Sequence, residues 1–167
     1  VFRGTPASMW MDNSDTMVKF PGRFWNDGKK IENISKGDEL PLNYVRFLQK
    51  GRHGDLKLLT GFWRQSVLLS GHSKGGRQAA LVMLLMPQHF LRCYSLDGPE
   101  IAAATKEEVK ELYGESYYQN VRGHIITINE ENDLVHVLGA EPGVELLAGE
   151  SYSFQSENPI TFEKIYR

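Results

Sequence analysis

The sequence holds a single cysteine, Cys93, so no internal disulfide bond can form. It also lacks an excess of charge of either sign: 19 basic and 21 acidic residues leave a net charge of -2, and no basic face for nucleic acid is visible. No apolar run reaches the roughly 18 to 20 residues that cross a bilayer. The first ten residues lack the apolar core of a signal peptide. The sequence therefore predicts no nucleic-acid partner and no transmembrane segment.

Metal and nucleotide motifs are missing as well. No group of histidine, cysteine and acidic residues has the spacing of a metal site, and the acidic run 130–133 lacks the alternation and glycine of a calcium loop. The stretch GHSKGG lacks the G-x-x-x-x-G-K-[ST] order of a phosphate-binding loop. We therefore expect neither a metal nor a cofactor.

The 167 residues suit a single globular domain, 1–167, with 41% hydrophobic and 24% charged residues. The chain has no initiator methionine and opens on VFRGT, which has the pattern of the end of a buried strand. We expect a piece of a longer protein that is incomplete at both ends. No signal peptide is visible, and the sequence leaves the compartment open between the cytoplasm and export without a visible signal.

Strands and helices alternate in the predicted secondary structure. Strands are predicted at 66–71, 90–97 and 123–133, and helices at 40–51, 76–86 and 105–118, the last with Thr105 and Glu108 as a capping box. Because parallel strands need long crossovers, this alternation indicates a parallel α/β sheet flanked by helices. The stretch with FPGRFWNDGKK and SKGDELP is predicted as a long connection, with one helix near 9–20. After Gly143, residues 144–154 and 160–167 are predicted as an antiparallel pair at the edge or a displaced flap.

Ser73 stands at the centre of a glycine-flanked turn, GHSKG, between an apolar strand and an apolar helix. The spacing matches G-x-S-x-G, the nucleophile elbow, in which the serine has a strained backbone and side chains two positions away would collide. The helix that follows directs its N-terminal dipole at the serine, which favours the negative charge of acyl transfer. The alternative is a glycine-rich turn with an inert serine.

The stretch LLSGHSKGGRQAAL resembles the elbow of α/β-hydrolases of the class 3 lipase group, and GHSKGG is especially similar to their Mbeg1-like branch. VFRGT is similar to the strand and turn that supply the oxyanion hole of those lipases, INEENDLVHVLG to the segment with their catalytic acid, and YSLDGPE to the DGPG stretch of the branch. The resemblance implies a lipase or esterase, phospholipases included, that cleaves acyl esters. It also implies a lipid substrate and transient contact with a membrane surface.

The resemblance makes Ser73 the nucleophile and Asp133 the acid that orients a catalytic histidine. The backbone N–H groups of Lys74 and Thr5 would form the oxyanion hole. The residues support these roles separately, because Asp133 follows a strand end, where catalytic groups of open parallel sheets collect, and Thr5 follows a glycine. Asp97 also ends a strand and is the competing acid, but its Asp-Gly-Pro setting is typical of a turn.

The catalytic histidine is missing from its expected place, because an α/β-hydrolase triad runs in the order Ser, Asp, His and the last segment, SENPITFEKIYR, contains no histidine. His136 follows Asp133, but by only three residues in the same predicted turn. The remaining histidines have the settings of elbow, turn or strand-end residues: His72, His53, His89 and His124. Three explanations stay open: a histidine beyond Arg167, another histidine of this chain, or a catalytically silent binding module. An acyltransferase that uses the same serine is a further alternative.

Overall fold

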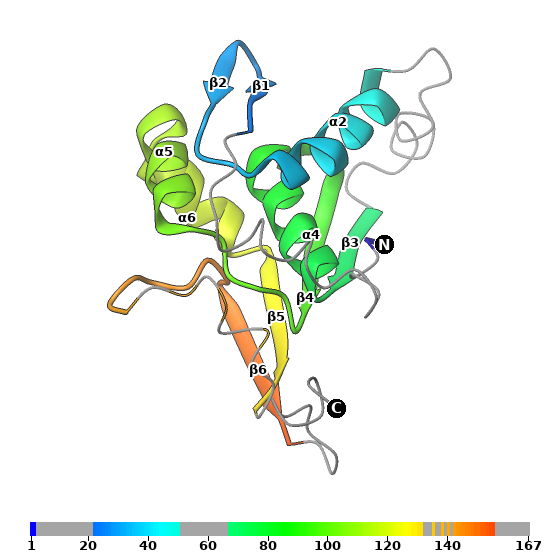
Figure 1. Ribbon diagram of the computed structural model, residues 1–167, viewed down its shortest axis with the longest axis vertical. Helices are drawn as coiled ribbons and strands as arrows, with labels where there is room; N and C mark the ends of the chain where they lie inside the picture. Colours follow the sequence, from blue (N-terminus) through cyan, green and yellow to red (C-terminus); the bar gives the residue numbers. More distant parts are fainter. Residues whose placement is uncertain are drawn as a thin grey trace.

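A four-stranded parallel sheet forms the centre of the protein (Figure 1). The computed structural model describes residues 1–2, 22–50, 67–131, 135, 138, 140 and 142–155. The sheet contains β3 (Val67–His72), β4 (Phe90–Leu96), β5 (Ile125–Glu130) and β6 (Glu150–Phe154), in that order. Phe2 adds a parallel bridge to Gly71, and its N–H donates to the Ser70 carbonyl at 2.7 Å. The predicted parallel α/β sheet flanked by helices is confirmed.

Helix α4 (Lys74–Leu85) packs at the centre of the hydrophobic core. Ser73 lies in the turn between the end of β3 and the start of α4. The helix packs against β3 and β4, while α2 (Lys36–Lys50) and α6 (Glu115–Arg122) pack against α4. Residues 79–85 are all buried, as expected for a helix that is apolar on nearly every side. A short 3-10 turn (Pro87–His89) joins α4 to β4.

Cys93 is a buried thiol on β4, opposite Ile125 of β5. Burial removes water from around the sulfur and raises the pKa of the Cys93 thiol to about 12. Because the thiolate is the reactive form, we expect the folded chain to resist a coloured disulfide-exchange reagent at about pH 8. The chain unfolded in guanidinium, where the thiol pKa returns toward about 8.5, should react completely. Equal rates of absorbance change before and after unfolding would contradict this expectation.

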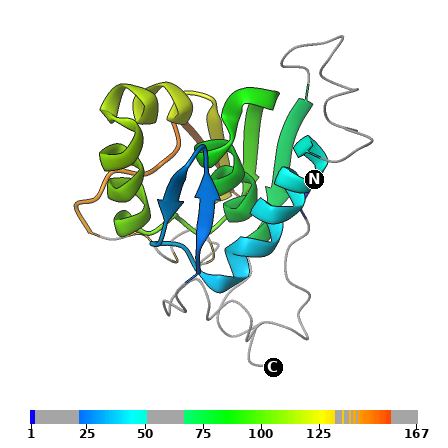
Figure 2. The same cartoon turned by 90° about the horizontal axis from the view of Figure 1, so that it is seen from above.

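A β-hairpin precedes α2, where the sequence predicted a connection. Its strands, β1 (Phe24–Asn26) and β2 (Lys29–Ile31), are joined by Asp27 and Gly28, which have φ values of 47° and 77°. Two positive φ values in a two-residue turn match the twist of a hairpin. The hairpin contacts α2 through β1 and α5 (Ala103–Tyr113) through β2 (Figure 2). The prediction was wrong because strands of three residues show too little alternation to stand out among turn formers.

Helix α2 begins at Lys36, within the stretch SKGDELP that was also predicted as connection. Ser35 donates both its N–H, at 3.1 Å, and its hydroxyl, at 2.7 Å, to one carboxylate oxygen of Asp38, and the N–H bond is one of the two bonds of a capping box. Pro41 has no N–H for the Gly37 carbonyl, and the Gln78 side chain of α4 donates to that carbonyl at 3.4 Å instead. The helix therefore tolerates Pro41 because α4 supplies the missing donor.

The predicted capping box of Thr105 and Glu108 is wrong. Helix α5 begins two residues earlier, at Ala103, so Thr105 lies inside its first turn, and Gly114 separates α5 from α6 within the predicted 105–118 helix. The Thr105 hydroxyl donates to the Asn33 carbonyl. The Glu108 carboxylate accepts from the N–H groups of Glu32, at 2.8 Å, and Asn33, at 2.7 Å. Both side chains bind the segment after β2, a partner that local spacing does not reveal.

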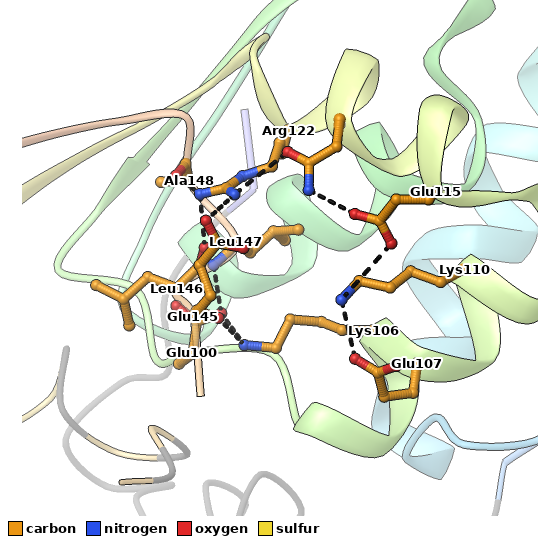
Figure 3. Close-up of polar contacts among 11 residues, drawn as sticks. Glu100, Lys106, Glu107, Lys110, Glu115, Arg122, Glu145, Leu146, Leu147 and Ala148 are labelled. Carbon is orange, nitrogen blue, oxygen red and sulfur yellow. Dashed lines mark hydrogen bonds and ion pairs between the residues drawn. The ribbon is translucent and has the colours of Figure 1, made fainter. Parts of the chain in front are cut away.

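Strand β6 runs parallel to β5, so the antiparallel pair or flap predicted for 144–154 is wrong, and 160–167 lies outside the described residues. A polar cluster binds the segment before β6 to α5 and α6 (Figure 3). Lys106 donates to the Glu145 carbonyl at 2.7 Å and to the Glu100 carboxylate at 3.3 Å. Arg122 donates to the carbonyl of Ala148 at 3.0 Å. These bonds hold the segment beside the residues that precede β5. Strand β6 therefore begins at the same edge of the sheet as β5 and runs parallel to it.

Candidate functional site

Ser73 occupies the turn between β3 and α4 with a φ of 54° and a ψ of -132°. This backbone conformation costs a residue with a side chain about 1–3 kcal/mol. The Ser73 N–H donates to the Leu96 carbonyl at 2.8 Å, and the Ser73 carbonyl accepts from the Gly76 N–H at 2.8 Å. The hydroxyl makes no capping bond to α4, and the residue is 7% exposed. The backbone is thus fixed by β4 and α4, and the strain predicted for this serine is present.

Two glycines let β3, α4 and the turn after β4 meet at the elbow. A Cβ at Gly71 would overlap the carbonyl group of Gly75. A Cβ at Gly98 would overlap the Ser95 hydroxyl and would lie 2.9 Å from the backbone nitrogen of Arg77. The collision predicted from the G-x-S-x-G spacing is therefore confirmed at Gly71.

A buried ion pair, missed in the sequence, joins the first turn of α4 to α2. Arg77 donates to an Asp38 carboxylate oxygen at 2.6 Å, and the two side chains are 4% and 0% exposed. The Arg77 N–H also donates to the Ser73 carbonyl at 3.3 Å. In the sequence, the arginine of GRQAAL looks like an exposed polar residue of a helix. The position of Asp38 three residues after Ser35 was the one feature that could have indicated a buried carboxylate.

The structure describes one of the two predicted oxyanion donors, Lys74. Lys74 is the first residue of α4, at the positive end of the helix dipole. Phe2 is paired in parallel with Gly71, so the chain at Phe2 runs toward the same edge of the sheet as the elbow. Thr5 lies outside the described residues, and its N–H in the oxyanion hole stays a prediction.

Asp97 lies at the edge of the sheet where Ser73 lies, because parallel strands end on the same side. Asp97 follows β4, has a φ of 45° and is 9% exposed. One of its oxygens accepts from the Glu130 N–H at 2.6 Å, and the other lies 3.9 Å from Nε2 of His72. Asp133 lies outside the described residues, three positions after the last residue of β5. The structure brings Asp97 to the elbow, and the role of Asp133 stays a prediction.

The histidines with described side chains do not present a general base to Ser73. His124 directly precedes β5, at the opposite edge of the sheet, where Nδ1 lies 3.2 Å from the Leu91 carbonyl. A Cβ at Gly71 would point toward α4, and successive residues of a strand point to opposite faces of the sheet. The His72 side chain therefore points to the face away from α4, where it is 64% exposed. The backbone of His89 ends the turn before β4, at the edge opposite Ser73, and its side chain lies outside the described part of the protein. His53 and His136 lie outside the described residues.

Metal ligands do not gather in the part of the chain that the structure describes. No group of three or more His, Cys, Asp or Glu side chains there could hold a metal ion. Within the same residues, every helix is too short or too polar to cross a membrane. The expectations of no metal and no transmembrane segment therefore still rest on the sequence.

Comparison with known proteins finds a distant structural likeness. No protein-family model matches the chain, and no curated protein matches it. The crystal structure of M37 lipase is similar to it with 20% sequence identity and a TM-score of 0.48 over 80% of this chain. The chain spans 43% of the length of that lipase. A function for this chain therefore has to rest on the residues around Ser73.

Proposed function

We propose that this chain is a serine hydrolase that cleaves acyl esters, with Ser73 as its nucleophile. One observation carries the proposal: Ser73 has a positive φ in a turn between a parallel strand and a buried helix. Glycine would adopt this conformation at lower cost, so an inert turn has no need of a serine there. Strained backbone of this kind collects at functional sites.

In the proposed reaction, the Ser73 hydroxyl oxygen attacks the ester carbonyl carbon while a histidine accepts the hydroxyl proton. The histidine returns that proton to the leaving alcohol, and water then hydrolyses the acyl-enzyme and frees the serine. The N–H groups of Lys74 and Thr5 stabilise the oxyanion, and Asp133 orients the histidine. The reaction needs no cofactor.

The base of this reaction is proposed to be His136 or a histidine beyond this sequence. His124 lies at the wrong edge of the sheet, and His72 points away from the face that α4 covers. Without a base the Ser73 hydroxyl would be a weak nucleophile at neutral pH. Covalent labelling of Ser73 in the closing experiment therefore reports whether a base activates the hydroxyl.

A lipid ester is the proposed substrate, on the resemblance to class 3 lipases. The outer face of α2 supports contact with a lipid surface, because Leu40, Tyr44 and Phe47 are exposed there at spacings of four and three residues. Leu42 and Val45 are buried on the opposite face of the same helix. An aliphatic and aromatic stripe of this kind suits the boundary between water and lipid.

A catalytically silent hydrolase-fold module is the second candidate. The observation that favours it is the position of His72 and His124, neither of which presents a base to Ser73. Such a module would keep the elbow for its packing and would bind a lipid or a protein without cleaving an ester.

A fluorophosphonate probe separates the two candidates, because it forms a covalent bond only with an activated serine. We expect the folded wild-type chain to be labelled on the peptide that contains Ser73, and the heat-unfolded chain to remain unlabelled. The Ser73→Ala variant is the matched control and should carry no label. A folded full-length protein without label would reject the hydrolase and favour the silent module.

A further inference from the structure

Asp97 continues the pairing of β4 and β5 with its side chain. The backbone ladder of these strands ends with the pair Leu96 and Ile128, and the Asp97 N–H donates to the Ile128 carbonyl at 3.0 Å. In a continued parallel ladder, the next donor, the Glu130 N–H, would meet the Asp97 backbone carbonyl. The chain instead turns away at Asp97, whose φ is 45°, and the Asp97 carboxylate accepts from the Glu130 N–H at 2.6 Å. The carboxylate therefore replaces a backbone acceptor.

The same carboxylate also faces β3. Its second oxygen lies 3.9 Å from Nε2 of His72, the residue before Ser73, so a protonated His72 would be attracted to it. We call Asp97, His72 and the Glu130 N–H the Asp97 junction. The junction brings together the C-terminal ends of β3, β4 and β5, at the edge of the sheet where Ser73 lies.

The backbone at the junction has little freedom to rearrange. Gly98 leaves no space for a side chain between Ser95 and the first turn of α4. Asp97 itself is 9% exposed, so water has limited access to replace a lost acceptor. Removal of the Asp97 carboxylate would therefore leave the Glu130 N–H without an acceptor. The lost hydrogen bond is one to a charged group, which is stronger than one between neutral groups.

We propose that Asp97 is a positioning residue, which sets the end of β3 with Ser73 relative to the end of β5 at Glu130. The proposal rests on the proposed hydrolase function. One Asp97 oxygen already accepts from the Glu130 N–H, and the other lies 3.9 Å from Nε2 of His72, whose side chain is 64% exposed. A displacement of about 1 Å between catalytic groups can lower a rate by about 100-fold.

The two roles of Asp97 differ in what they need from the side chain. A positioning residue needs an oxygen acceptor for the Glu130 N–H, which the amide of Asn supplies. A triad acid needs a negative charge beside the histidine, which Asn lacks. The variants Asp97→Ala and Asp97→Asn therefore separate the roles.

The experiment measures two quantities on the intact chain: hydrogen exchange of the peptide that covers Glu130, and the rate of fluorophosphonate labelling at Ser73 against probe concentration. For Asp97→Ala we expect faster exchange at Glu130 and a maximal labelling rate about 10 to 100 times lower, with unchanged half-saturation. Asp97→Asn should keep slow exchange and label within about threefold of the wild type. Glu108→Ala is the matched control, because Glu108 is a carboxylate that likewise binds backbone N–H groups, those of Glu32 and Asn33, and is not part of the Asp97 junction. It should change exchange at residues 32–33 and leave labelling unchanged.

Each other outcome overturns the proposal in a recognisable way. Unchanged exchange at Glu130 in Asp97→Ala would show that the junction does not hold β5. Wild-type labelling in Asp97→Ala would show that the junction does not act on Ser73. A loss in Asp97→Asn as large as in Asp97→Ala would make Asp97 the acid. A full-length wild-type protein without label would reject the hydrolase, and catalytic positioning with it, while the exchange data would still report on the junction.

Discussion

Replacement of Ser73 by glycine is expected to abolish ester hydrolysis and to raise the stability of the fold at the same time. Loss of the nucleophile from a triad lowers turnover by about 10⁴-fold or more. The φ of 54° and ψ of -132° at Ser73 cost a residue with a Cβ about 1–3 kcal/mol, whereas glycine adopts this backbone freely. After the larger entropy of glycine in the unfolded chain is subtracted, we expect a gain of about 1 kcal/mol in the free energy of unfolding.

Ser73→Ala is the matched control for this prediction. Alanine removes the hydroxyl but keeps the Cβ, so turnover should fall as far as in Ser73→Gly while the free energy of unfolding stays near that of the wild type. Urea denaturation followed by circular dichroism measures stability, and release of p-nitrophenol from a short-chain ester measures turnover. A glycine variant less stable than the alanine variant would contradict backbone strain at the elbow.

The elbow was predictable because every part of its pattern is local. Residues 66–76 contain the strand, the glycine that must approach Gly75 and the start of the helix, so the spacing alone specified the turn. The order of elements was predictable for a similar reason, since each strand is followed by a segment long enough for a parallel crossover. The bridge between Phe2 and Gly71 then agrees with a strand at VFRGT beside β3.

The missed features depend on partners that are distant in the sequence. Thr105 and Glu108 have the spacing of a capping box, yet they bind Asn33 and its neighbour, more than 70 residues away. Strand β6 joins the sheet in parallel because Lys106 and Arg122 bind the segment before it. Local periodicity contains no information on such contacts, so register and direction at this edge could not be derived from it.

The site was only partly predictable for the same reason. Asp97 was recognised as a strand-end carboxylate, but its bond to the Glu130 N–H depends on the register of β4 and β5. The 3.9 Å approach of His72 to Asp97 likewise depends on the register of β3 and β4. Parallel strands place their ends together, but only the register shows which side chains meet there.

The second large effect is expected at the buried ion pair of Asp38 and Arg77. Asp38→Ala leaves the Arg77 charge buried without its partner, and removal of one member of a buried pair costs about 3 to 5 kcal/mol. The change also removes the acceptor of the Ser35 N–H and hydroxyl before α2. Urea denaturation should therefore give a midpoint far below that of the wild type. The labelling rate of the remaining folded protein should fall too, because the Arg77 N–H bonds the Ser73 carbonyl.

Two further variants show whether burial is the cause of this loss. Glu107→Ala breaks an ion pair with Lys110 on the exposed face of α5, and a surface pair contributes about 0 to 1 kcal/mol, so stability should change little. The double variant Asp38→Asn with Arg77→Met removes both buried charges, keeps an acceptor for Ser35, and should cost less than Asp38→Ala alone. A double variant less stable than Asp38→Ala would mean that the attraction of the pair exceeds the cost of its burial. A loss below about 1 kcal/mol in Asp38→Ala itself would contradict the pair as the link between α2 and the elbow.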